Sequence, residues 1–152
     1  MIIAIVQARM GSSRLPKKVL MDIEGTSSLR FMIDRVEKSN LIDKTIVATT
    51  NDEKDDQIVK FCDDNNILCF RGSENDVLDR YYQSAKKYEA TTVVRLTSDC
   101  PLIDPDVIDE TINLFLKEKV DYASNAVPPD EKKYPDGSDV EVFSFDALKR
   151  SW

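Results

Sequence analysis

Residues 5–20 read Ile-Val-Gln-Ala-Arg-Met-Gly-Ser-Ser-Arg-Leu-Pro-Lys-Lys-Val-Leu, a polar loop between two apolar runs. The loop contains one glycine, two serines and four cations, Arg9, Arg14, Lys17 and Lys18. Small residues let the backbone approach a ligand closely, and backbone N–H groups together with Arg and Lys side chains neutralise phosphate oxygens. We therefore predict that this loop cradles a triphosphate; the alternative is a solvated basic loop after a strand.

Apolar and amphipathic segments alternate along the rest of the chain. Residues 2–6 form a continuous apolar run, which is typical of a parallel strand buried on both faces. Further strands are predicted at 45–49, 67–70, 91–96, 122–125 and 140–145. Helices are predicted from Thr26 or Ser27, over 53–64, from Asn75 or Asp76, from Asp104 before Pro105, and from Asp146. This order predicts an α/β fold, a three-layer sandwich with a mostly parallel central sheet, as one domain over residues 1–152.

The spacing of apolar residues also predicts which side chains face the core. The helix from Asn75 or Asp76 is expected to place inward, or at its margins, Leu78, Tyr81, Tyr82, Ala85 and Tyr88. The helix after Asp104 is expected to have an apolar face made of Ile108, Ile112, Phe115 and Leu116. Residues 19–23 are predicted to form a short strand-like link.

The composition excludes several classes of function. A net charge of −7 argues against nucleic acid or a membrane surface as a partner. The three cysteines form no Cys-x-x-Cys motif and the chain has no histidine, so we expect no zinc site or disulfide framework, and a reducing cytoplasm fits. No run approaches the roughly 20 apolar residues of a membrane span. Because the commonest general base is missing, chemistry driven by a metal and by charge is favoured.

A second polar feature follows the strand predicted at 91–96. Ligands of open α/β sheets lie at the carboxyl ends of the strands, so Asp99 and the loop at 8–18 are expected at the same edge. A carboxylate beside a phosphate cradle is well placed to hold a magnesium ion that bridges phosphates. The alternative is that Asp99 caps a turn before Pro101.

Both polar features resemble motifs of a known family. Residues 7–16, Gln-Ala-Arg-Met-Gly-Ser-Ser-Arg-Leu-Pro, followed by Lys18, resemble the opening motif of the CMP-sugar cytidylyltransferases. They are most similar to the spore-coat polysaccharide biosynthesis branch of the acylneuraminate cytidylyltransferase-like family. Lys17 departs from the pattern, because the family commonly has glycine there. Residues 96–102, Leu-Thr-Ser-Asp-Cys-Pro-Leu, resemble the family's metal-binding motif.

The resemblance implies a nucleotide-diphospho-sugar transferase fold of the GT-A-like type and roles for single residues. Asp99 would bind the catalytic Mg²⁺. Arg9 and Lys18 would act in catalysis by holding the triphosphate, and Arg14 would assist them. The nucleotide-binding residues that the resemblance implies are Ala8, Arg9, Met10, Gly11, Ser12, Arg14, Lys18 and Arg71.

Residues 70–81 also look like the family. An arginine placed like Arg71 holds the nucleotide near its base in related synthetases; the alternative for Arg71 is a surface side chain after a strand. Asp79 and Arg80 lie on a predicted helix, so a salt bridge is their expected role.

Residues 134–142, Tyr-Pro-Asp-Gly-Ser-Asp-Val-Glu-Val, alternate with a period of two, which puts Asp139 and Glu141 on one face of a strand. Two carboxylates on one face can bind sugar hydroxyls or a second cation; the alternative is a solvated face in an acidic protein. The segment resembles the family's Tyr-Pro-Asp-Gly-x-Asp-Val-Glu run. That resemblance implies a substrate site in which Asp136 and Gly137 close over the sugar.

These features predict a cytidylyltransferase that takes CTP and an acidic or related sugar, and releases pyrophosphate and a CMP-sugar for surface or spore-coat polysaccharide synthesis. A glycosyltransferase of the same fold is a second hypothesis, ranked lower because Thr97 interrupts the Asp-x-Asp pattern of those enzymes. A third hypothesis is a nucleotide-binding domain without catalysis. Family members usually continue for many more residues, which supply a further metal-binding acid and much of a dimer contact. We therefore expect either a fragment or a shortened protein, and a homodimer fits the family.

Overall fold

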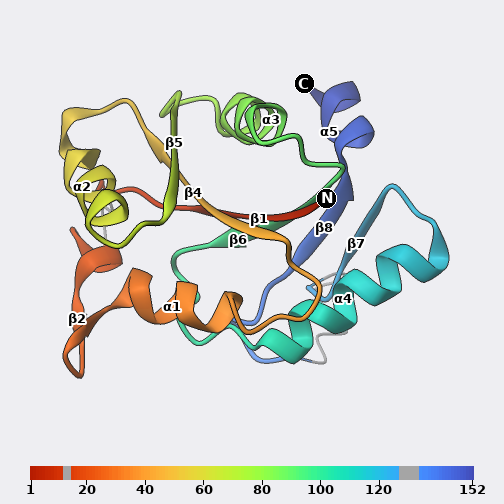
Figure 1. Cartoon of the computed structure of the whole chain (residues 1–152), viewed down its shortest axis with the longest axis horizontal. Helices are drawn as coiled ribbons and strands as arrows, with labels where there is room; N and C mark the ends of the chain where they lie inside the picture. The colour runs from red at the N-terminus through yellow and green to blue at the C-terminus, as the bar shows by residue number, and fades with distance from the viewer. Residues whose placement is uncertain (12–14, 127–133) are drawn as a thin grey trace.

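The computed structural model describes residues 1–11, 15–126 and 134–152 of the chain. Its main sheet has six strands in the order β5-β4-β1-β6-β8-β7 (Figure 1). The parallel strands are β1 (Ile2–Gln7), β4 (Lys44–Thr50), β5 (Leu68–Gly72) and β6 (Thr92–Thr97). The antiparallel strands at one edge are β7 (Tyr122–Ser124) and β8 (Glu141–Ser144). The predicted α/β fold with a mostly parallel sheet is thereby confirmed.

Strand β1 lies near the centre of the sheet, between β4 and β6. Its Ile5 pairs with Ile46 of β4 on one side and with Arg95 of β6 on the other. Ile3 and Ile5 belong to the apolar cluster on one face of the sheet, while Ala4 and Val6 belong to the cluster on the other face. Because both faces of β1 are fully buried, its apolar run does not need to alternate with polar residues.

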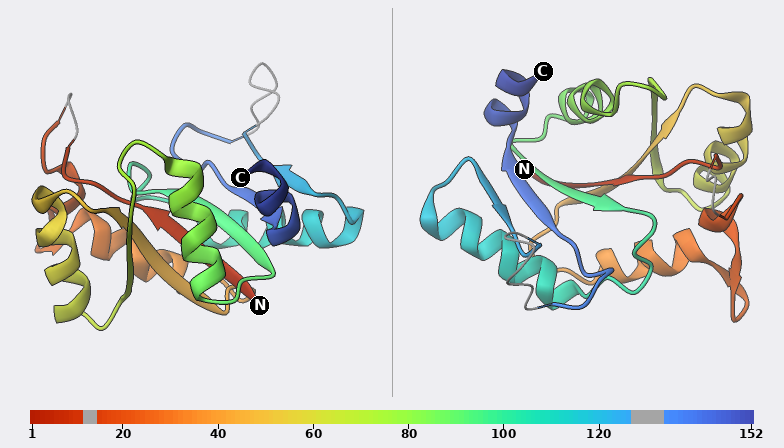
Figure 2. Two further views of the ribbon diagram at one scale, coloured as in Figure 1. Left: turned by 90° about the horizontal axis from the view of Figure 1, so that it is seen from above. Right: turned by 180° about the vertical axis from the view of Figure 1, so that it is seen from behind.

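Helices cover both faces of this sheet, which confirms the three-layer arrangement (Figure 2). One face is covered by α1 (Ser28–Val36), α2 (Asp56–Asp64) and α4 (Pro105–Glu118). The other face is covered by α3 (Val77–Lys87) and α5 (Phe145–Ser151). None of the helices in the described part of the chain is long and apolar enough to cross a membrane.

Side-chain caps set the helix starts largely as predicted. Ser27 accepts a hydrogen bond from the Arg30 N–H at 3.2 Å, and Asp76 accepts one from the Asp79 N–H at 2.8 Å. Asp104 caps α4 with Pro105 at its first position. The predicted start of the last helix at Asp146 is wrong by one residue. Ser144 is the cap there because its hydroxyl accepts from the Ala147 N–H at 3.0 Å.

Local geometry corrects three details. The helix predicted over 53–64 divides into a 3-10 turn, η2 (Glu53–Asp55), and α2. Residues 19–23 are not one strand-like link, because Lys17 adopts a left-handed φ of 63° and starts a 3-10 turn, η1 (Lys18–Leu20). Strand β2 (Asp22–Ile23) then pairs with β3 (Thr26–Ser27) in a separate two-stranded sheet. Leu116 is 48% exposed because it lies about 100° around the helix from Phe115, which takes the core position. Leu78 is 40% exposed at the margin of α3, which agrees with its predicted place.

Candidate functional site

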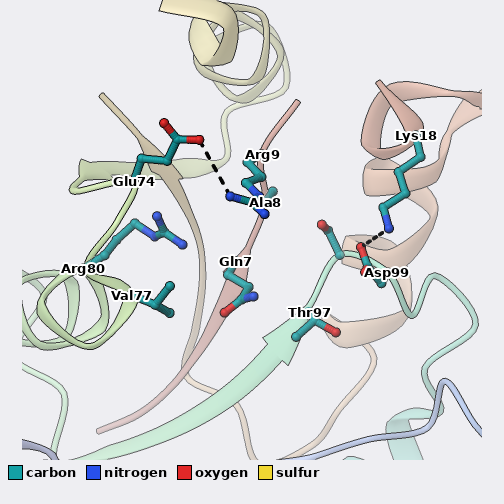
Figure 3. Close-up of a pocket in the computed structure, with 10 residues that line it drawn as sticks. Gln7, Ala8, Arg9, Lys18, Glu74, Val77, Arg80, Thr97 and Asp99 are labelled. Carbon is teal, nitrogen blue, oxygen red and sulfur yellow. Dashed lines mark ion pairs between the residues drawn. The ribbon is translucent and has the colours of Figure 1, made fainter. Parts of the chain in front are cut away.

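A cleft of about 260 Å³ lies at the carboxyl ends of β1 and β6 (Figure 3). It is lined by Gln7, Ala8, Arg9, Lys18, Glu74, Val77, Arg80, Thr97, Ser98 and Asp99. Glu74, Val77 and Arg80 stand on one side, Lys18 and Asp99 stand on the other, and β1 runs between them. The first residues after two neighbouring parallel strands therefore meet at one edge, as the topology requires.

One wall of the cleft holds an ion pair between the loops after β1 and β6. The Lys18 Nζ lies 2.9 Å from the Asp99 Oδ1, and the two side chains are 27% and 53% exposed. Ser98 joins the loops at their base, because its N–H donates to the Gln7 carbonyl at 3.0 Å. A turn closed by the Cys100 N–H on the Thr97 carbonyl at 3.1 Å then presents Asp99 to the cleft.

A buried carboxylate anchors the start of the phosphate-loop candidate. Asp55 is 2% exposed, and its Oδ1 accepts from the Met10 N–H at 2.7 Å. Its Oδ2 accepts from the Thr50 N–H at 3.3 Å and from the Thr50 hydroxyl. Asp55 thus ties the loop after β1 to the end of β4. The sequence alone did not reveal this role, because Asp55 stands in an acidic stretch with no spacing that singles it out.

The opposite wall is built by the loop before α3 and by the first turns of that helix. The Arg9 guanidinium lies 3.7 Å from the Glu74 carboxylate. Arg80 is 3% exposed, lines the cleft, and donates from its Nη1 to the Ser73 carbonyl at 2.7 Å. No motif in the sequence assigned a site role to Arg80.

The predicted salt bridge between Asp79 and Arg80 is wrong. Asp79 accepts instead from the Gln83 Nε2 at 3.0 Å and from the Trp152 Nε1 at 2.8 Å. The physical reason is helical geometry, because consecutive residues point about 100° apart and do not face each other.

The structure brings together four of the residues singled out in the sequence, Ala8, Arg9, Lys18 and Asp99. Met10 is buried below them, and Gly11 is exposed outside the lining. Ser12 and Arg14 lie outside the described residues.

Arg71 lies apart from the lining of the cleft. Its Nε donates to the Thr50 carbonyl, its Nη2 donates to the Asp52 carbonyl, both at 2.9 Å, and its Nη1 meets Asp56 at 2.6 Å. These bonds fasten the segment between β4 and α2. Its predicted contact near the nucleotide base stays a prediction.

The predicted sugar-binding segment borders a second cavity. Val140 and Val142 are buried, Asp139 is exposed and Glu141 is partly exposed, so burial alternates as predicted. The strand itself begins only at Glu141, so the prediction that Asp139 lies on it is wrong. Glu141 forms an ion pair with Arg95 and lines a cavity of about 380 Å³ between α3, β8 and α5, whose other walls are mostly apolar. Val77 lines both cavities, so they adjoin along the same face of β6.

Gly137 turns the chain before this strand with a left-handed φ of 92°, and Asp136 precedes it. Neither residue lines the cleft beside Asp99.

The donor set fits a divalent ion that shares its coordination with a ligand. The described residues contain no group of three or more His, Cys, Asp or Glu side chains that could hold a metal by themselves. Mg²⁺ commonly uses one or two carboxylates, several waters and substrate phosphates. Asp99, exposed in a cleft beside cationic side chains, would supply a carboxylate to such a site.

Fold and cleft together define an α/β protein of nucleotidyltransferase-like fold, with a cleft lined by cationic side chains at the carboxyl edge of its sheet. The profile of the family described as Cytidylyltransferase matches residues 3–152. The chain therefore belongs to the cytidylyltransferase family.

Two relatives in particular show this likeness in sequence. An uncharacterized protein of Methanocaldococcus jannaschii is 42% identical over 151 residues, which are 99% of this chain and 60% of the relative. The spore coat polysaccharide biosynthesis protein SpsF of Bacillus subtilis is 36% identical over 125 residues, or 80% of this chain and 52% of that protein. The chain thus spans between half and two thirds of these relatives.

Solved structures agree with the sequence relatives. A cytidylyltransferase from Leptospira borgpetersenii superposes with a TM-score of 0.90 at 35% identity, over 98% of this chain and 62% of that one. The synthetase of CMP-2-keto-3-deoxy-manno-octonic acid, solved with CTP, superposes with a TM-score of 0.75 at 18% identity, over 99% of this chain and 76% of that one. The second likeness shows the shared fold alone.

Proposed function

We propose that the protein transfers a cytidylyl group from CTP to a sugar hydroxyl and releases pyrophosphate. The observation that carries this proposal is the meeting of Arg9, Lys18 and Asp99 in one cleft at the carboxyl edge of the sheet. Cationic side chains at that edge suit a triphosphate, and a carboxylate among them suits the metal that a triphosphate carries. Membership of the cytidylyltransferase family supports CTP as the nucleotide.

Each cleft residue has a role that its chemistry supports. Lys18 and Arg9 would bind the phosphates, and Asp99 would hold the divalent ion. A divalent ion bound there would neutralise negative charge that builds up on the phosphates. In the free protein Lys18 and Asp99 neutralise each other at 2.9 Å. If a nucleotide and its divalent ion bound in the cleft, Lys18 would pair with phosphate oxygen and Asp99 would hold the ion, so neither charge would stay unpaired.

The reaction needs positioning and charge more than a protein base. The sugar oxygen forms a bond to the α-phosphorus, and the bond between that phosphorus and the pyrophosphate oxygen breaks. Pyrophosphate takes the electron pair of the broken bond. The hydroxyl proton passes to bound water or to a group of the sugar, since the chain contains no histidine. Arg9 and Lys18 would stabilise the charge that develops on the leaving pyrophosphate.

For the acceptor, we place the sugar toward the second cavity. That cavity adjoins the cleft at Val77, and the Arg95–Glu141 pair offers it donors and acceptors for hydroxyl or carboxylate groups. Asp136, Gly137 and Asp139 would complete the sugar site from the segment before β8. The likeness to SpsF supports a sugar destined for spore-coat or other surface polysaccharide. The resemblance of the sequence motifs to the acylneuraminate cytidylyltransferase-like family supports an acidic sugar.

The test is pyrophosphate release from each of the four nucleoside triphosphates, with Mg²⁺ or Mn²⁺, against a panel of nonulosonic acids, hexoses and sugar phosphates. We expect release from CTP with a subset of sugars, and its loss in the presence of a chelator. CTP binding without release in any combination would overturn catalysis and support a binding domain. Transfer from a nucleotide-sugar donor to an acceptor would support the glycosyltransferase hypothesis instead.

A further inference from the structure

Arg80 is a buried cation in the wall of the cleft, and among the residues that the structure describes it forms no ion pair. It is 3% exposed, and its buried Nε meets no hydrogen-bond acceptor among the described residues. Its Nη1 donates to the Ser73 carbonyl at 2.7 Å, and that acceptor is neutral. The other cations of the cleft differ, because Arg9 pairs with Glu74 and Lys18 pairs with Asp99. Within the described residues, no carboxylate lies at ion-pair distance from Arg80.

A buried guanidinium without an ion-pair partner is unfavourable in the free protein. Burial is the main cause that lowers the pKa of the Arg80 guanidinium, and the positive charge of Arg9 lowers it further. Tyr81 and the carboxylates of Asp55 and Glu74 act in the opposite direction but do not offset the burial. Arginine nevertheless stays protonated in proteins, so its charge persists. A buried charge without a partner opposes folding unless a ligand neutralises it. Two arginines on one wall with a single carboxylate therefore leave room for an anion.

The close packing of α3 against the end of β5 holds Arg80 in this position. A Cβ atom at Gly72 would lie 2.9 Å from the Arg80 Cγ and 3.1 Å from the Phe70 ring. Glycine at the end of β5 is therefore what lets the first turns of α3 approach the sheet so closely. The Ser73 hydroxyl also accepts from the Asp76 N–H at 3.0 Å, which holds the loop that carries the Arg80 acceptor.

We propose that Arg80 is a phosphate-binding residue of this cleft and clamps the nucleotide's triphosphate together with Arg9. A phosphate chain fits better than a nucleobase, because only an anion neutralises a buried guanidinium. The identity of the ligand as CTP rests on the proposed function. The inference of an anion site is independent of that function. It depends on the burial of Arg80, on the absence of an ion pair to it among the described residues and on its packing against Gly72.

The test is calorimetric titration with inorganic triphosphate, CTP and cytidine, together with thermal unfolding. Arg80→Met should weaken triphosphate and CTP binding by about 10- to 100-fold, the loss expected for a charge-assisted hydrogen bond. Cytidine binding should not change, and the melting temperature should stay equal or rise because a buried unpaired charge is gone. Arg80→Lys should be intermediate, since it keeps the charge but not the planar fork. Lys86→Met, which removes a charge from the exposed side of the same helix, is the matched control and should bind as wild type.

Gly72→Ala supplies a second route if Arg80→Met does not fold, because it keeps the charge and moves the guanidinium. It should also weaken triphosphate binding. Unchanged triphosphate affinity in both variants, an equal loss for cytidine, or a wild-type protein that does not bind triphosphate would each overturn the inference. Failure of the proposed function looks different: triphosphate binding would depend on Arg80, yet CTP would release no pyrophosphate with any sugar.

Discussion

At the scale of single residues, the site contains two kinds of charged side chain. Some are exposed to the cleft, where a ligand could contact them, and one is buried and holds the loops together. Lys18 and Asp99 form an ion pair open to solvent, and pairs of this kind contribute only about 0–1 kcal/mol to stability. Asp55 is the opposite case, a buried carboxylate whose bonds join two loops. Substitution of Asp99 should therefore affect mainly activity, whereas substitution of Asp55 should affect mainly the free energy of unfolding.

Replacing the carboxylate of Asp99 tests its role without disturbing the fold. Asp99→Asn should lower pyrophosphate release by at least about 100-fold, because the residue proposed to hold the metal loses its charge. The melting temperature should change by only about 1–2 °C, since an exposed pair adds little stability. A variant with wild-type turnover would remove Asp99 from the metal site.

Replacing Asp55 tests the anchor of the loop. Asp55→Ala leaves the Met10 N–H and the Thr50 hydroxyl without their partner, which should cost about 2–3 kcal/mol of unfolding free energy in urea titration. CTP affinity should fall as well, because Met10 follows Arg9 directly. Glu53→Ala, an exposed acidic neighbour, is the control and should stay within about 0.5 kcal/mol of wild type. Equal stability of the two variants would contradict the anchoring role.

At the scale of elements, the residue types predicted the starts of helices better than they predicted the paths of the segments between elements. Ser27, Asp76 and Asp104 cap helices as their residue types indicate. The path of the chain after the phosphate-loop candidate could not be predicted, because it depends on the left-handed backbone conformation of Lys17. Glycine is the residue that usually indicates such a conformation, and it is absent from this position. The structure accounts for the glycine that the family commonly has at this place, since glycine adopts a positive φ without steric cost.

Glycine at left-handed positions should therefore stabilise the fold. Lys17 has φ 63° and Glu89, after α3, has φ 59°. Lys17→Gly and Glu89→Gly should each add about 0.5 kcal/mol to the unfolding free energy, as relief of strain exceeds the added chain entropy. CTP affinity should be unchanged in both, because Lys17 is exposed and does not line the cleft. A gain in CTP affinity in Lys17→Gly alone would show that the lysine crowds the phosphates.

At the scale of the whole molecule, the sheet gathers distant residues into one site. The fold and half of the cleft were predictable, because buried parallel strands have apolar runs and their carboxyl ends share an edge. Arg80 and Asp55 were not predictable from their positions. Arg80 reaches the cleft only through the close packing of α3 on Gly72, and Asp55 acts through backbone groups. The second cavity likewise depends on how β8 and α5 meet α3.

The lining of the cleft differs in charge from the molecule as a whole. The chain carries −7 overall, yet the cleft gathers three cations and two carboxylates. One of those cations, Arg80, lies outside the motif that resembles the family's opening loop. A triphosphate with its metal is the ligand that this mixture of charges suits.

The fate of labelled phosphorus in CTP tests the central claim most directly. With the accepted sugar and Mg²⁺, label in the α-phosphate should appear in a CMP-sugar, and label in the γ-phosphate should appear in pyrophosphate. The two products should form in equal amounts, because breaking one bond makes both. Label from the γ-phosphate in inorganic phosphate or in a sugar phosphate would show that a different bond breaks and would contradict cytidylyl transfer.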